Sequence, residues 1–215
     1  MVCSVALHKN GELLASQNHQ VEKSHSSLLP GIGLEVCKEA NMTFSDLDAV
    51  AVSSGPGSYT GLRIGVTNAK GICYTLNKPL IAIPSLDVIA EAVRGKFLGD
   101  YLLCPMMDAR RMEVYTQIED QNGKIIWELQ PRILDGNTFQ EFDKPLYLFG
   151  DGMPKFREIS NQDNLIFIDD IFPEAKNMGR LAQDKFHAED FEDVAYFEPN
   201  YLKEWRTTKP KKQLL

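Results

Sequence analysis

The residues of this chain that are best suited to chemistry lie in one glycine-rich stretch. That stretch, SSGPGSYTGLRIGV, covers residues 53–66 and separates an apolar, β-branched segment from a segment with helical periodicity. The first N–H groups of a helix have no partner inside the helix, so a corner between a strand and a helix can bind an anion. The residues of this candidate ligand loop are Gly55, Pro56, Gly57, Ser58, Thr60, Gly61 and Arg63.

The known phosphate-binding and nucleophile motifs do not fit this corner. In a dinucleotide-binding fingerprint counted from Gly55, the third glycine falls on Thr60, and Gly61 comes one residue late. A P-loop needs Lys followed by Ser or Thr, and a nucleophile elbow needs the pattern G-x-S-x-G, which Ser58 lacks. The corner is therefore equally compatible with a structural turn and with a ligand loop.

Other residues that could bind a metal or act in catalysis are scattered. Leu29 stands four residues after His25, so the pair of histidines that binds a metal on one helix face is absent. Asp108 ends an apolar segment and is followed by Arg110 and Arg111, which favours an ion pair over a catalytic carboxylate. We therefore predict no metal site and no catalytic residue.

The elements expected around the corner alternate between strands and helices. Asn10-Gly11 joins two extended segments, which predicts a hairpin. The periodicity of apolar residues then predicts a helix, a strand, a helix, a strand and a helix over 28–40, 47–53, 60–76, 80–83 and 86–93. Pro30 weakens the first helix, so contacts from outside that helix must hold its first turn.

The second half of the chain repeats this pattern. A second hairpin is expected around Asn122-Gly123, and strands at 146–149 and 165–168 precede a helix at 175–186. An apolar strand at 101–107 precedes the second hairpin, whereas the first hairpin has no such strand before it. We therefore predict an α/β protein with mixed sheets in two lobes, 1–98 and 99–215, with the first strand of the amino-terminal lobe missing from this chain.

Small residues follow one side of the helix after the corner. Gly61, Gly65 and Ala69 are spaced by four and form a smooth ridge that another backbone can approach closely. This ridge could lie on the lobe's own sheet or on a helix of another protein. Leu62 and Ile72 add apolar surface in further directions, which favours a partner.

The composition is that of a globular protein inside the cell. The net charge of -7 disfavours broad binding to nucleic acid, and the basic segment 203–212 is interpreted as a solvated tail rather than an RNA contact. No apolar stretch is long enough to span a membrane, and the first residues do not resemble an export signal, so we expect a cytoplasmic protein. The four cysteines are widely spaced and are expected to be reduced and buried.

Four segments resemble the TsaB (YeaZ) family over nearly the whole chain: SSGPGSYTGLRIGV, CSVAL, MDARRMEVY and EPNYLKE. The resemblance implies the two-lobed fold of actin, Hsp70 and the sugar kinases (the ASKHA fold). It also implies a non-catalytic subunit that activates a TsaD-like catalytic subunit, which transfers a threonylcarbamoyl group to the adenosine beside the anticodon of tRNA. A TsaE-like ATPase joins them, and ATP and magnesium are used by the complex rather than by this subunit.

The resemblance further implies that the partner subunit binds the two helices that follow the hairpin and the corner, and that tRNA is contacted only indirectly. Without its partner, the chain is expected to form a homodimer through the same face. The interface residues are then His25, Leu28, Leu29, Ile32, Val36, Leu62, Gly65, Ala69 and Ile72.

Two departures from the family bear on function. Catalytic relatives carry two metal-binding histidines on the first helix, whereas this chain has only His25 there. The strand that ends in an acidic residue before CSVAL is also absent. Two alternatives remain open: an ATP-dependent small-molecule kinase that uses the corner and Asp108, and, with less support, a glycoprotease-like metallopeptidase.

Overall fold

The structure is a computed structural model that describes residues 2–20 and 25–202. Its first half contains four strands, three α-helices and a short 3-10 helix, η1 (Phe44–Asp46). The strands and α-helices are, in chain order, β1 (Val2–Lys9), β2 (Glu12–Gln20), α1 (His25–Glu39), β3 (Val50–Gly55), α2 (Tyr59–Leu76), β4 (Leu80–Pro84) and α3 (Ser85–Glu91).

The hairpin predicted around Asn10-Gly11 is confirmed. β1 and β2 pair in antiparallel fashion, and Lys9 lies opposite Glu12. Asn10 and Gly11 both have positive φ angles, of 52° and 79°. A two-residue turn with both φ angles positive matches the twist of the strands that it joins, which is why Asn-Gly is favoured there.

The glycine corner connects a strand to a helix, as the sequence predicts. β3 and β4 pair in parallel, and α2 forms the crossover between them. Val66 and Cys73 of α2 pack on Val52 of β3 and Leu80 of β4 in one apolar cluster. The helix ends at Asn77, whose φ of 49° and ψ of 49° give the left-handed cap that stops helices.

Helix α1 continues through Pro30. Proline removes one backbone hydrogen bond from a helix, so packing must stabilise this segment. Ile32 and Val36 of α1 are buried against Cys3 and Leu7 of β1, and this contact supplies that stabilisation. These residues lie beyond the first turn, whose side chains are outside those that the structure describes, so the expectation that outside contacts hold the first turn stays a prediction.

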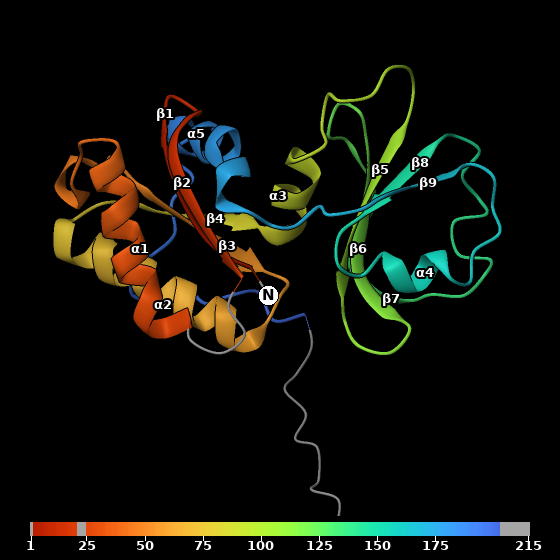
Figure 1. Cartoon of the computed structure of the whole chain (residues 1–215), viewed down its shortest axis with the longest axis horizontal. Helices are drawn as coiled ribbons and strands as arrows, with labels where there is room; N and C mark the ends of the chain where they lie inside the picture. Colours follow the sequence, from red (N-terminus) through yellow and green to blue (C-terminus); the bar gives the residue numbers. More distant parts are fainter. Residues whose placement is uncertain (1, 21–24, 203–215) are drawn as a thin grey trace, which may run out of the picture.

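The second half is built on one five-stranded mixed sheet, shown with its helix α4 on one side of Figure 1. The strand order is β7-β6-β5-β8-β9, in which β5 is antiparallel to β6 and parallel to β8. One apolar cluster, which includes Phe156 of α4, covers one face, and a second cluster around Phe149 packs the sheet against α3. The elements are β5 (Leu102–Asp108), β6 (Glu113–Asp120), β7 (Ile125–Ile133), β8 (Leu146–Phe149), α4 (Pro154–Arg157) and β9 (Leu165–Ile168).

The second predicted hairpin is present, but its turn differs from the first. Only Gly123 has a positive φ, of 84°, whereas Asn122 does not. Gly123 N–H donates to the Asp120 carbonyl at 3.0 Å, and the Asp120 side chain accepts from the Asn122 and Lys124 N–H groups. The Asp120 carboxylate thus organises a longer turn, and the hydrogen bonds to Lys124 and Asn122 hold its pKa below the usual range.

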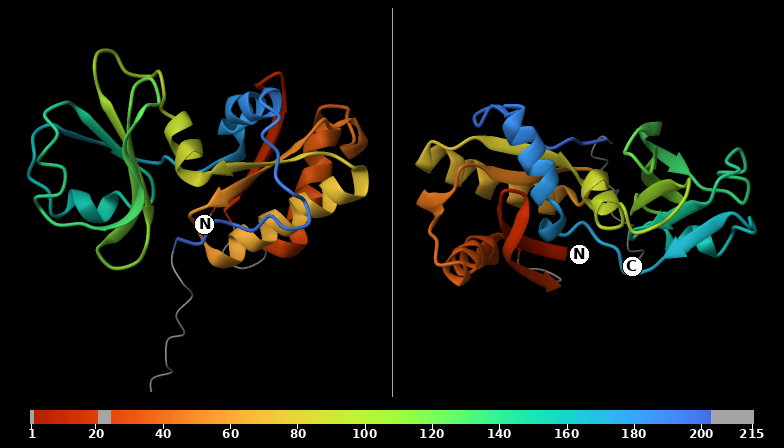
Figure 2. Two further views of the ribbon diagram at one scale, coloured as in Figure 1. Left: turned by 180° about the vertical axis from the view of Figure 1, so that it is seen from behind. Right: turned by 90° about the horizontal axis from the view of Figure 1, so that it is seen from above.

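The end of the described chain returns to the first half, as both views of Figure 2 show. A 3-10 helix, η2 (Ala175–Asn177), and α5 (Gly179–His187) follow β9. Leu181 and Phe186 of α5 pack on Ile81 and Ile83 of β4. The division into lobes 1–98 and 99–215 stays a prediction. Helix α5 belongs to the second range by sequence but packs on β4 of the first.

The strands of the first half form two separate sheets rather than one. β1 pairs with β2, β3 pairs with β4, and no described strand connects the two pairs. In the second half, by contrast, β5 joins the hairpin β6–β7 to the parallel pair β8–β9. The α/β class with a mixed sheet that was predicted from the sequence is confirmed, and the mixed sheet lies in the second half.

Candidate functional site

The glycine corner is a tightly packed turn. The Gly55–Pro56 peptide is cis, and Gly55 has a φ of 104°, which favours glycine. A Cβ atom on Gly55 would lie only 2.9 Å from the carbonyl oxygen of Asn200. Asn200 N–H in turn donates to the Ser54 carbonyl at 2.7 Å, so residue 200 closes over the corner.

The start of α2 satisfies part of its own backbone. The Ser58 hydroxyl accepts from Gly61 N–H at 3.3 Å, and Leu62 N–H donates to the Ser58 carbonyl. Arg63 donates to the Tyr59 hydroxyl at 2.7 Å, and the Tyr59 ring packs at a tilt of 36° against that of Tyr201, with ring centroids 4.9 Å apart. These contacts are those of a structural turn that begins a helix. That the corner binds a ligand stays a prediction.

Helices α1 and α2 lie side by side in Figure 1 and contact each other, and each carries an exposed large apolar or aromatic side chain. On α1, Leu34 is 57% exposed, and on α2, Tyr74 is 85% exposed. Between α2 and η1 a groove of about 450 Å³ is lined by Phe44, Asn68 and Ile72, among others. We call Leu34, Tyr74 and this groove the α1/α2 face.

The structure places the predicted interface residues at different depths. Leu29, Gly65 and Ile72 are half-buried, and the side chains of His25 and Leu28 lie outside those that the structure describes. The remaining residues are between 1% and 9% exposed, and they are Ile32, Val36, Leu62 and Ala69.

The ridge of small residues faces the chain's own sheet. A Cβ atom on Gly65 would lie 3.6 Å from Val52 of β3, and Ala69 is buried in the cluster that joins α2 to β3. This is the first of the two interpretations that the spacing allowed. Leu34 and Tyr74, rather than the ridge, are the exposed candidates for contact with a partner. The sequence contains a signal for Leu34, because this apolar residue lies outside the buried stripe of α1.

Asp108 forms an ion pair, although its partner is not one of the neighbouring arginines. Lys155 of α4 contacts the Asp108 carboxylate and donates to the carbonyl of Arg111 at 2.8 Å. The Asp151 carboxylate accepts from Asp108 N–H at 2.9 Å. A lysine from a distant helix therefore holds the end of β5, and nothing in the local sequence pattern marks Lys155.

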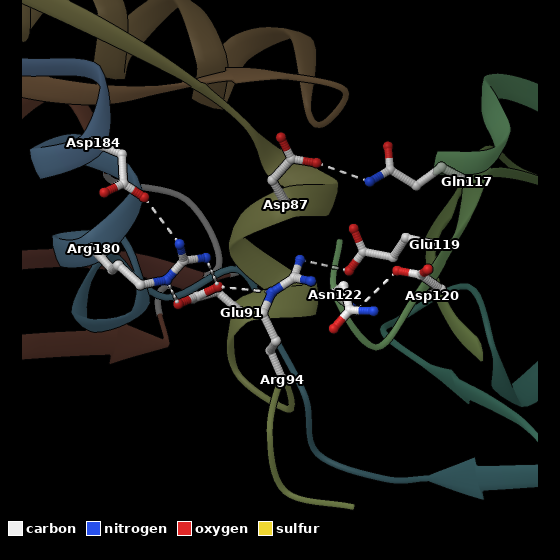
Figure 3. Close-up of polar contacts among 9 residues, drawn as sticks. All are labelled: Asp87, Glu91, Arg94, Gln117, Glu119, Asp120, Asn122, Arg180 and Asp184. Carbon is white, nitrogen blue, oxygen red and sulfur yellow. Dashed lines mark hydrogen bonds and ion pairs between the residues drawn. The ribbon is translucent and has the colours of Figure 1, made fainter. Parts of the chain in front are cut away.

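A partly buried network of charged residues connects α3 and the residues that follow it to β6 and α5 (Figure 3). Arg94 donates to Glu91 at 3.1 Å and to Glu119 of β6 at 2.7 Å. Arg180 of α5 donates to both oxygens of Glu91, at 2.5 and 2.6 Å. Asp87 of α3 accepts from Gln117 of β6 at 2.8 Å, so β6 is joined both to α3 and, through Arg94, to the segment after it.

Burial and charge act in opposite directions on the two glutamates of this network. The Glu119 side chain is only 3% exposed, and burial raises its pKa despite the charge of Arg94. For Glu91, burial also acts to raise the pKa, but the hydrogen bonds and charges of Arg180 and Arg94 outweigh it, so the pKa lies below its usual range. The charged form of Glu119 is therefore stabilised by its ion pair with Arg94 and disfavoured by burial.

The described residues offer little for metal or nucleophile chemistry. Among them, no cluster of three or more His, Cys, Asp or Glu side chains could hold a metal ion. All four cysteines are buried and unpaired, and burial raises the pKa of the Cys104 thiol to about 12. None of the helices in the described ranges combines the length and apolar character needed to cross a bilayer.

The sequence of the chain was compared with known protein families and proteins. A family model described as TsaD, tRNA N6-adenosine threonylcarbamoyltransferase, matches residues 12–202. The chain is 32% identical over 155 residues to "tRNA threonylcarbamoyladenosine biosynthesis protein TsaB" of Bacillus subtilis, covering 68% of this chain and 65% of that protein. The chain belongs to the TsaD family and is a homologue of TsaB.

Further comparisons agree with this assignment. The TsaB of Escherichia coli is 27% identical over 212 residues, which cover 94% of this chain and 90% of that protein. The solved structure "YeaZ from Pseudomonas aeruginosa" superposes with a TM-score of 0.78 at 24% identity, covering 94% of both chains. This TsaB homologue therefore has the α/β fold with mixed sheets that YeaZ has.

Proposed function

We propose that this chain is a non-catalytic scaffold subunit in the biosynthesis of threonylcarbamoyladenosine on tRNA. It binds and activates a TsaD-like catalytic subunit, which carries out the transfer to N6 of adenosine. The observation that carries the proposal is the α1/α2 face, on which Leu34, Tyr74 and the groove beside η1 present apolar surface. The names of its TsaB relatives support the pathway.

The arrangement that we propose has two lobes. The amino-terminal lobe consists of β1–β4 with α1–α3 and takes in α5, and the five-stranded sheet with α4 forms the other lobe. In this arrangement residues 171–202 belong to the amino-terminal lobe together with residues 1–98. Phe186 packs on β4, and a β-bridge between Leu80 and Glu192 joins the same segment to β4. The network of Arg94 and Glu119 lies where the lobes meet.

Docking through α1 and α2 has a physical basis. Exposed aromatic and leucine side chains on two adjacent helices bury apolar area when helices of a second protein pack against them. Without that partner, a second copy of the chain covers the same face, which gives a symmetric homodimer. A TsaE-like ATPase and tRNA join through the partner, and this subunit itself holds no cofactor.

No observation favours the alternative functions. For a kinase, Asp108 would have to be available to a ligand, whereas Lys155 already binds it. For a metallopeptidase, the described residues contain no cluster of metal ligands. We therefore propose neither.

Binding to the partner tests the proposal directly. The full chain, mixed with the TsaD-like subunit of the same organism, is expected to form a stable complex in a calorimetric titration. Tyr74→Ala and Leu34→Arg are expected to weaken binding by about tenfold or more, as loss of a buried interface anchor does. The matched control is Ile133→Arg on β7, since Ile133 is 77% exposed and lies outside the α1/α2 face.

Two results would contradict the proposal. The first is the absence of binding at micromolar concentrations of both proteins. The second is equal weakening by Leu34→Arg and by the Ile133→Arg control, which would place the interface elsewhere or make the effect unspecific.

A further inference from the structure

We propose that the turn between β5 and β6 carries a binding site for the phosphate backbone of RNA. The site consists of Arg110 and Arg111, and basic and aromatic side chains at the start of α2 extend it. We call residues 109–112 the arginine turn. This inference goes beyond the proposed function, in which RNA joins through the partner, because it assigns a direct contact with RNA to this chain.

The backbone of the arginine turn has a conformation that arginine adopts at a cost. Arg110 and Arg111 both have positive φ angles, of 71° and 52°. Glycine and asparagine accept such angles most readily, and the first hairpin of this chain uses Asn10 and Gly11 for them, at 52° and 79°. The fold of the turn therefore does not require arginine. Residues that keep a strained backbone in this way are typical of functional sites.

Three polar contacts hold the arginine turn in this conformation. The Asp108 carboxylate accepts from the Arg110 N–H at 3.2 Å, and Lys155 of α4 donates to the Arg111 carbonyl at 2.8 Å. The Glu113 N–H donates to the Arg110 carbonyl at 3.2 Å and closes the turn. Since these contacts use the backbone of the two arginines, they fix the turn without occupying either guanidinium group.

The charges of the arginine turn are not neutralised by the described part of the chain. Both arginine side chains are exposed, and no ion pair or side-chain hydrogen bond among residues 2–20 and 25–202 involves either of them. By contrast, Arg94, Arg157 and Arg180 each pair with a carboxylate. Asp108, the nearest carboxylate in the sequence, is itself paired with Lys155. Two adjacent cations are therefore available to an anionic ligand.

A basic and aromatic cluster lies close to the arginine turn. A Cβ atom on Gly57 would lie 3.7 Å from the methyl carbon of Met107, so the glycine corner packs against the end of β5. In the helix that follows the corner, the Arg63 guanidinium lies 5.2 Å from the centroid of the Tyr59 ring, which packs against Tyr201. Both tyrosines are partly exposed. The start of α2, the end of the described chain and the arginine turn lie on the lower side of the molecule in Figure 1.

This combination of side chains fits RNA better than it fits other anions. Guanidinium groups bind phosphate oxygens, and aromatic rings stack on unpaired bases. An acidic peptide would use the arginines but not the rings. A single nucleotide with its metal ion is disfavoured, because Lys155 already binds the carboxylate of Asp108.

The distribution of charge along the sequence points to the same ligand. The chain as a whole has a net charge of -7, which disfavours binding of RNA over its whole surface. Shortly after Tyr201, however, residues 203–212 contain five Lys and Arg residues and one Glu. Positive charge is therefore concentrated in the sequence next to the aromatic cluster, which favours a local contact with phosphates.

Replacing the two arginines with the residues of the first hairpin tests the proposal. The double variant Arg110→Asn/Arg111→Gly removes both charges and supplies residues that accept a positive φ. It is expected to melt at the same or a higher temperature and to bind the TsaD-like subunit as the unchanged chain does. The matched control is Lys144→Gln/Arg157→Gln, which removes two cations that pair with surface carboxylates elsewhere.

Fluorescence anisotropy with a labelled tRNA transcript measures binding by the full chain and by its complex with the TsaD-like subunit. At physiological salt the chain is expected to bind with a dissociation constant of about 1–100 µM, as for contacts made mainly to phosphates. The double variant is expected to bind at least about tenfold more weakly. The slope of log K against log salt is expected to fall by about 1–2, since two phosphate contacts are lost.

Two further variants keep the test decisive. Arg110→Lys/Arg111→Lys keeps the charges and is expected to keep the salt slope of the unchanged chain. If the double variant does not fold, Arg111→Gln alone takes its place, and the expected fall of the slope is then about 1.

Several results would overturn the proposal. These are no binding of the transcript at 0.5 mM of the chain or its complex, equal binding by the double variant, and equal weakening by the matched control. Displacement of the transcript by polyglutamate or by ATP with magnesium at no higher concentration than by unlabelled RNA would make an acidic protein or a nucleotide the ligand instead. Binding of the TsaD-like subunit is measured separately, so failure of this inference is distinguishable from failure of the proposed function.

Discussion

Replacing Arg94 with methionine is the sharpest test of how the two halves of the molecule are joined. Arg94 is the only charged partner that donates to Glu119 among the described residues, at 2.7 Å, and the Glu119 side chain is 3% exposed. Methionine keeps much of the side-chain volume of Arg94 but leaves a buried carboxylate without its cation. Breaking a buried pair in this way costs about 3–5 kcal/mol of the free energy of unfolding.

The loss also depends on pH, with a definite sign. Burial raises the folded-state pKa of Glu119 above its unfolded value. The stability linked to that proton is fully present below the unfolded pKa and is lost as pH rises through the folded pKa. Removing Arg94 raises the folded pKa further, so the destabilisation by Arg94→Met is larger at pH 7.5 than at pH 5.

Urea denaturation followed by circular dichroism measures both effects. With an m-value of about 2–3 kcal/mol/M, a loss of about 3 kcal/mol lowers the urea midpoint by roughly 1–1.5 M. In the double variant with Glu119→Gln, most of the loss is recovered, because a neutral amide replaces the buried charge. Lys144→Met is the control, since Lys144 pairs with Asp100 at the surface and both side chains are more than half exposed.

A small effect of Arg94→Met would contradict the role of this buried ion pair. If Arg94→Met lowers the free energy of unfolding by less than about 1 kcal/mol at pH 7.5, the pair does not carry the cost of a buried charge. If Glu119→Gln fails to restore stability in the double variant, the loss arises from packing of the arginine side chain instead.

Three further predictions concern single positions. Gly150→Ala is expected to prevent normal folding, because a Cβ atom there would lie 2.2 Å from the Met106 carbonyl oxygen at a φ of 102°, and a wild-type melting curve would contradict this. The thiols of Cys73 and Cys104, with pKa values raised by burial to about 11 and about 12, are expected to react with Ellman's reagent at pH 8 only after denaturation, and rapid labelling of the folded chain would show otherwise. Asn77→Gly is expected to keep or raise the melting temperature whereas Asn77→Ala lowers stability by about 1 kcal/mol, since residue 77 caps α2 at a φ of 49°, and equal effects of the two changes would argue against the cap.

Local patterns in the sequence are sufficient to predict most elements of this fold. The turn at Asn10-Gly11 and the strand, corner and helix from Val50 to Leu76 are encoded by neighbouring residues, because turn conformation and hydrophobic period are local properties. The repeat of one pattern in both halves is also visible without coordinates.

Contacts between distant residues were decided only by the tertiary structure. Lys155 binds Asp108 across 47 positions of the chain, and Arg94 binds Glu119 across 25, so no local pattern could have selected these partners. The same holds for depth: Ile32 and Ala69 carry the spacing of an interface, but β1 and β3 cover them. Helical periodicity identifies an apolar side of a helix, whereas what covers that side is fixed by the packing of elements that are remote in sequence.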